Sequence, residues 1–161
     1  MTPSSRASSL VALAVLAAPL VSRSAAQHPP FRYQYAAKVV CGAVRQGVPL
    51  VSQSYATIIN VNNASDSLTV FFRKWLVVTE PPGMQQPQPP LEVLKDTLPQ
   101  RFALAIDCRD LWKRNPKAPR PFFDGFVIIQ STLPLDVMGV YSVPGGVDVV
   151  SVAERQIYVG K

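Results

Sequence analysis

Histidine is scarce in this sequence, and that scarcity narrows the chemistry available to the chain. The only histidine, His28, lies between a glutamine and two prolines. A catalytic triad needs its imidazole held rigidly beside a nucleophile, which this setting does not provide. Two cysteines and one histidine do not complete a zinc shell, and no segment has the DxDxDG spacing of a calcium loop. We therefore expect no catalytic residue, no metal site and no cofactor.

Long apolar runs are also lacking. The run Leu10 to Val21 has 12 residues, too few to span a bilayer comfortably. It follows Arg6 and precedes the small residues Ser24-Ala25-Ala26, an order typical of a cleaved secretory signal peptide. A retained membrane anchor is the alternative, and Pro19 argues against it.

This reading divides the chain into three parts. We expect a signal peptide at 1–26, an extended leader at 27–32 and a single β-sandwich domain at 33–161. The mature chain would then contain no transmembrane segment and would be exported to the periplasm or the extracellular space.

Cysteine is limited to Cys41 and Cys108. In an oxidising compartment, two cysteines predict one disulfide. Such a bond would close a loop of roughly 70 residues and stabilise the fold by about 4 kcal/mol in the chain-entropy model. Two separate buried thiols are the alternative.

Long helices are not expected, because the sequence contains 16 prolines. Alternating apolar and polar residues instead predict about eight strands. They fall at 33–41, 55–62, 67–80, 91–97, 100–108, 122–131, 135–142 and 147–152, with a short helix at 107–114 and a short final strand or tail from 153. The pattern favours an all-β fold, an antiparallel two-sheet sandwich of the immunoglobulin-like kind. A closed barrel is the alternative.

Two local expectations follow from the same pattern. The strands at 55–62 and 67–80 flank a cluster of turn-forming residues, which predicts that they pair as a hairpin. Alternation also predicts which side chains share a buried face, namely Tyr33, Tyr35, Ala37, Val39 and Cys41 in one strand and Phe102, Leu104 and Ile106 in another.

Several motifs together resemble a known group. They are YAAKVVCG at 35–42, YATIINVNN at 55–63, IDC at 106–108, GFVIIQS at 125–131 and LPLDVMGVYS at 133–142. Across 33–142 this order resembles small exported bacterial β-sandwich proteins of unassigned function. The resemblance implies a β-sandwich and transfers no catalytic residue. A fainter likeness, in fold only, exists to the cytosolic β-sandwich transducers of microbial rhodopsins.

The positive charge of the chain is concentrated in one proline-rich segment. Removal of 1–26 would leave 14 basic and 10 acidic side chains, which is mildly basic and is no strong nucleic-acid signature. Five positive charges fall within twelve residues, and Trp112 and Phe122 flank them. The five are Arg109, Lys113, Arg114, Lys117 and Arg120. A basic loop with aromatics can bind an anionic polymer. The alternative is a solvated loop that keeps the chain dispersed.

Aromatic and acidic residues supply the remaining candidates. Trp75 and Trp112 could offer planar rings to a carbohydrate, although packing in a core or a subunit contact is the commoner role. We expect Asp107 to cap the short helix with Asp110 in a solvated turn, and Asp124 and Asp136 to face solvent. The sequon Asn63-Ala64-Ser65 would be accessible if it lay in a turn.

The sequence therefore predicts a non-catalytic exported module that acts through surface contacts. Its partner would be an envelope protein or an anionic polymer such as an acidic polysaccharide, and self-association is a weaker prediction. A carbohydrate-binding module using exposed aromatics is the second hypothesis, and a hydrolase using aspartate pairs is the third.

Overall fold

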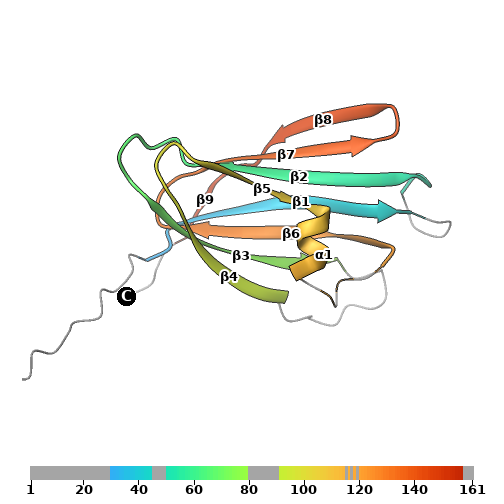
Figure 1. Cartoon of the computed structure of the whole chain (residues 1–161), viewed down its shortest axis with the longest axis horizontal. Helices are drawn as coiled ribbons and strands as arrows, with labels where there is room; N and C mark the ends of the chain where they lie inside the picture. Colours follow the sequence, from blue (N-terminus) through green and yellow to red (C-terminus); the bar gives the residue numbers. More distant parts are fainter. Residues whose placement is uncertain are drawn as a thin grey trace, which may run out of the picture.

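The computed structural model describes residues 30–44, 50–79, 91–114, 116, 118 and 120–157. The expected signal peptide, the proline-rich stretch 80–90 and Lys117 lie outside these residues. One short helix and nine strands make up the described fold (Figure 1). They are β1 (Tyr33–Ala43), β2 (Ser54–Asn62), β3 (Val70–Val78), β4 (Leu91–Leu98), β5 (Ala103–Asp107), α1 (Cys108–Arg114), β6 (Phe122–Ser131), β7 (Asp136–Val143), β8 (Gly146–Ser151) and β9 (Arg155–Gln156).

All the strand pairs are antiparallel, and they form one sheet in the order β4-β3-β6-β1-β2-β7-β8. β5 pairs with β2, and β9 pairs with β1. The expected all-β antiparallel fold is thus confirmed.

The sheet consists of two groups of strands with a narrow junction. We call β4, β3, β6, β1 and β9 the first ladder, and β5, β2, β7 and β8 the second ladder. Within the described residues, strand pairing between the two ladders is limited to Gly42–Tyr55 and Ala43–Ser54. Beyond the junction β1 and β2 separate, and Thr57 Oγ1 takes the place of a backbone partner for Val40 at 3.0 Å. This arrangement is consistent with the predicted two-layer sandwich.

The core lies between the two ladders. In β1 every second residue from Tyr35 to Cys41 is buried, as the alternation predicted. The second ladder contributes Ile59, Val61 and Val137 to the same cluster. Each ladder therefore has one core-facing side and one outer side, as expected for half-buried antiparallel strands.

The hairpin predicted for the second and third strands is wrong. β2 pairs with β1, β5 and β7, whereas β3 pairs with β4 and β6. The chain between them crosses from one ladder to the other. Turn-forming residues predict a change of direction but do not say which strand the chain joins next.

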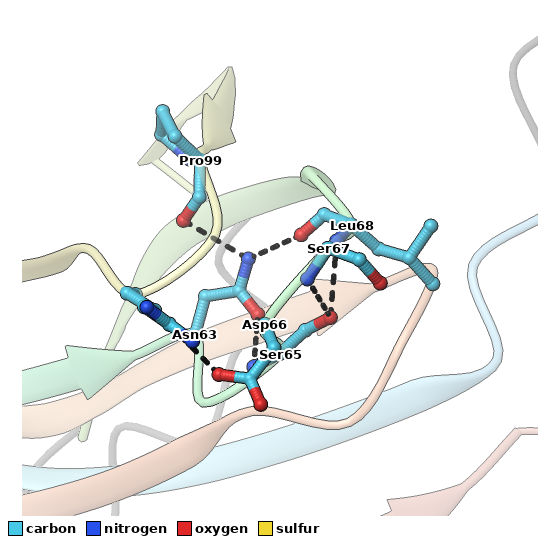
Figure 2. Close-up of polar contacts among 7 residues, drawn as sticks. Asn63, Ser65, Asp66, Ser67, Leu68 and Pro99 are labelled. Atoms are coloured by element: carbon cyan, nitrogen blue, oxygen red, sulfur yellow. Dashed lines mark hydrogen bonds and ion pairs between the residues drawn. The ribbon is translucent and has the colours of Figure 1, made fainter.

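Asn63 is the residue that holds this crossing in place (Figure 2). Its side chain is buried, and its Nδ2 donates to the carbonyl oxygens of Leu68 at 2.8 Å, Leu98 at 3.0 Å and Pro99 at 3.0 Å. Its Oδ1 accepts the Ser65 N–H at 3.1 Å. The sequon therefore does not present an accessible asparagine in the folded protein, because the amide that would carry a glycan is buried.

Phe102 also departs from the expectation, since 61% of the residue is exposed. It precedes β5, and its backbone carbonyl accepts the Asn63 N–H at 2.9 Å while its N–H donates to Pro99 at 3.3 Å. The turn therefore sets the direction of this side chain, and the alternation begins only with β5, where Ile106 is buried.

Candidate functional site

Helix α1 is fixed at its start by two interactions. Asp107 Oδ1 accepts the Asp110 N–H at 2.7 Å, which is the predicted N-cap. Cys108 forms the predicted disulfide with Cys41, with 5.6 Å between their Cα atoms. The bond joins the first residue of α1 to the end of β1, so the short helix is held against the junction of the ladders.

Three basic side chains and one aromatic meet beside this helix. Arg109 and Lys113 are one helical turn apart on α1, so they lie on the same side of it. Arg120 precedes β6, and its guanidinium lies 6.0 Å from the centroid of the Trp112 ring. These side chains line an open groove of about 680 Å³ together with Cys108 and Pro121. We call this site the basic groove, and none of the described residues that line it is acidic.

The other two members of the predicted basic cluster are not part of the groove. Arg114 forms an ion pair with Asp110, with Nε 2.7 Å from Oδ1, and lines a small pocket beneath α1. Lys117 lies outside the described residues. The structure therefore brings together Arg109, Lys113 and Arg120 and separates Arg114 from them.

The two tryptophans occupy different surroundings. Trp112 is half-buried and packs edge-on against Phe123, with 5.5 Å between the ring centroids. Trp75 lies on the side of β3 that faces away from the buried Phe72, and the Arg73 guanidinium is 5.7 Å from the centroid of the Trp75 ring. The two rings do not form one platform, because Trp112 lines the basic groove and Trp75 belongs to the outer side of the first ladder.

The aspartates do not form a converging pair. Asp124 on β6 contacts Lys38, with 2.5 Å between Oδ1 and Nζ. Asp136 on β7 accepts from Asn62 at 3.3 Å. Each carboxylate has a separate partner on a different ladder. In the described part of the chain, no three histidine, cysteine, aspartate or glutamate side chains are grouped closely enough to hold a metal ion.

Two side chains with polar groups face the core, and only one of them, Tyr35, was expected there from the sequence. Lys74 alternates with Phe72 and Leu76 on the inner side of β3, where burial lowers its pKa although Asp110 opposes the shift. Burial raises the pKa of Tyr35 to about 12. The Tyr35 hydroxyl donates to Glu154 at 3.1 Å and accepts the Leu135 N–H at 2.7 Å. The sequence could have predicted the position of Lys74, because Lys74 lies two residues after Phe72 in a strand and so faces the same side.

Comparison with known proteins gives a limited result. No family model matches the chain, and no curated protein matches it. A solved structure titled "Crystal Structure of Thermotoga maritima 1070" is similar over 79% of this chain and 96% of its own, with 9% identity and a TM-score of 0.47. At this level of similarity it assigns no family. None of the helical structure in the described ranges has the length and hydrophobicity that a membrane crossing needs.

Proposed function

We propose that this protein is a non-catalytic exported binding module whose basic groove binds an anionic polysaccharide. The single observation that carries the proposal is the convergence of Arg109, Lys113 and Arg120 around Trp112 in a groove whose described lining residues include no acidic side chain. The disulfide supports export, because such bonds persist in oxidising compartments.

The chemistry of the groove suits a polymer with regularly spaced anionic groups. Arg109, Lys113 and Arg120 are all exposed, so each can reach a carboxylate or sulfate group. Binding of exposed cations to a polyanion releases counterions, so affinity falls steeply as salt rises. The Trp112 ring beside them adds an apolar surface on which a sugar ring could rest.

The test compares two double variants that change the net charge equally. Arg109→Glu with Lys113→Glu reverses the charge of the groove. Arg32→Glu with Arg155→Glu is the control, because it changes the net charge by the same amount at exposed positions outside the groove. We expect the groove variant to elute from immobilised heparin at much lower salt than the wild type, and the control variant to elute close to it.

Equal losses of retention in the two variants would reject the groove, because net charge alone would then account for binding. An envelope protein as the partner makes a different prediction. A pull-down from envelope extracts with the wild type would then recover an envelope protein that the groove variant does not recover. Neither the wild type nor the groove variant would be retained on heparin.

A second candidate is carbohydrate binding on the outer side of the first ladder. Trp75 and Arg73 lie there beside a polar track, since Arg73 Nε donates to Gln130 at 2.7 Å and Gln130 donates to Gln34 at 2.7 Å. A neutral glycan that quenches tryptophan fluorescence in the wild type and in Trp112→Phe, but not in Trp75→Phe, would support this candidate. No change across a glycan panel would remove it.

A further inference from the structure

The outer side of the second ladder carries an apolar patch that no part of the described chain covers. Ile58, Val140 and Val149 lie opposite one another on β2, β7 and β8, so they form one continuous row across three strands. Met138 lies two residues before Val140 on the same side of β7. We call these four residues the outer patch. Ile58 is 42% exposed and Val149 is 58% exposed.

The charge of this ladder differs from that of the rest of the chain. β2, β5, β7 and β8 contain no lysine or arginine, and their only charged residues are Asp107, Asp136 and Asp148. The whole chain carries a formal charge of +6. Two copies would therefore repel each other least if they approached through the second ladder.

From this combination we infer that the outer patch is a self-association surface, through which two copies of the chain pack face to face. An anionic lipid surface fits less well, because proteins that bind such membranes surround their apolar residues with lysine and arginine. The outer patch has aspartates on its ladder instead.

The free edge of β8 is a poorer contact than the face. Asp148 Oδ1 accepts the backbone N–H of Val149 at 2.9 Å. A strand that added to this edge would have to displace that carboxylate. β4, at the other end of the sheet, has the same feature, since Asp96 accepts the Thr97 N–H at 2.8 Å. Edges protected by charge are a known defence against strand addition, so association through the face is favoured.

The size of the face sets the expected strength. Four strands spaced about 4.8 Å apart and roughly 20 Å long cover roughly 400 Å² of each copy, so a face-to-face contact would bury roughly 800 Å² in total. This area is smaller than that of most stable interfaces, so we expect a weak, reversible dimer with a dissociation constant in the upper micromolar range.

Sedimentation velocity of the purified protein across the micromolar range tests the inference. We expect wild type to pass from monomer to dimer, and Ile58→Lys to remain monomeric throughout. Val77→Lys is the matched control, because Val77 is similarly exposed, at 37%, on the outer side of the first ladder. It should dimerise like the wild type. If Ile58→Lys fails to fold, Val149→Lys on the edge strand replaces it.

Four outcomes would overturn the inference. In the first, the wild type is monomeric at every concentration, and in the second, Val77→Lys is as monomeric as Ile58→Lys. In the third, the wild type is monomeric and co-floats with phospholipid vesicles. In the fourth, Asp148→Ala strengthens the dimer. The last outcome would assign the contact to the β8 edge. The dimer should persist in high salt and in Arg109→Glu with Lys113→Glu, so its fate is separable from that of polysaccharide binding.

Discussion

At the residue scale, Asn63 stabilises the crossing between the ladders through one side chain. Its amide nitrogen lies within hydrogen-bond distance of three backbone carbonyls, so its two hydrogens are shared among them. Two of these carbonyls belong to Leu98, the last residue of β4, and to Pro99, which follows it. A buried carbonyl without a donor costs about 1 to 3 kcal/mol. The residue therefore satisfies polar groups from two separate parts of the chain.

Replacement of Asn63 by alanine should lower the free energy of unfolding by about 3 kcal/mol, because several buried carbonyls would lose their donor. Urea denaturation measures the change. Asn62→Ala is the control, since Asn62 is half-exposed with one longer contact to Asp136, and it should cost about 0.5 kcal/mol. Equal effects of the two substitutions would contradict this role for Asn63.

Tyr35 gives the fold a dependence on alkaline pH. Its pKa in the folded protein is about 12, chiefly because burial disfavours the phenolate and also because Glu154 lies beside the hydroxyl. In the unfolded chain the pKa is about 10. The folded state thus holds the proton more tightly. The associated stability is complete below pH 10 and is lost as pH rises from about 10 to about 12.

We expect this loss to reach roughly 2 to 3 kcal/mol at the upper end of that window. Tyr35→Phe should be less stable than wild type at neutral pH by about 1 to 2 kcal/mol, because the Leu135 N–H loses its acceptor. Between pH 10 and 12, the unfolding free energy of Tyr35→Phe should fall less than that of the wild type. Tyr55→Phe, which removes an exposed hydroxyl, should keep the wild-type pH profile. Parallel profiles for all three proteins would refute the assignment.

At the scale of elements, the junction of the two ladders depends on a glycine. Gly42 has a φ of 98°, and a Cβ added to it would lie 1.9 Å from the carbonyl oxygen of Pro121. It also pairs with Tyr55 and with Phe122, so the same residue contacts both ladders. A side chain here would force β1 away from the start of β6.

Gly42→Ala should therefore destabilise the protein by about 3 kcal/mol or more, through strain and through the clash with backbone. Gly145 is a matched control, because its φ is 94° but a Cβ there would meet nothing within 4 Å. Gly145→Ala should cost about 1 kcal/mol from strain alone. Thermal unfolding of the two variants compares these costs. Similar melting temperatures would show that the Pro121 carbonyl does not exclude a side chain at position 42.

The sequence predicted the elements of this fold better than their connections. The range of β6, the buried face of β1 and the N-cap of α1 all depend on neighbouring residues, so local patterns reveal them. The partner of β3 depends on residues far away, and alternation carries no information about it. The Cys41–Cys108 pair was an exception, because two cysteines allow only one intramolecular bond.

The candidate site shows the same division. Clustering in the sequence identified the basic segment, but only the structure shows that Arg114 turns to Asp110 while Arg120 reaches Trp112. The helix periodicity could have separated Arg109 and Lys113 from Asp110 and Arg114 in advance. The position of Arg120 could not be foreseen, because a proline-rich loop has no regular period.

At the scale of the whole molecule, charge and apolar surface are distributed unevenly. The first ladder and α1 carry most of the basic residues of the described chain, and the second ladder carries none in its strands. The proposed polysaccharide site and the proposed dimer surface thus use different parts of the protein. A dimer would present two basic grooves to one polymer, which raises apparent affinity without any new contact.

The buried amide of Asn63 also bears on the order in which the protein folds. Its hydrogen bonds to Leu98 and Pro99 span 35 and 36 residues, so they form only after β3 and β4 have brought that turn back to the crossing. Contacts of such long range form at a high cost in chain entropy and hence tend to form late. The connection that joins the two ladders should therefore be among the last parts to become ordered, after each ladder has begun to assemble.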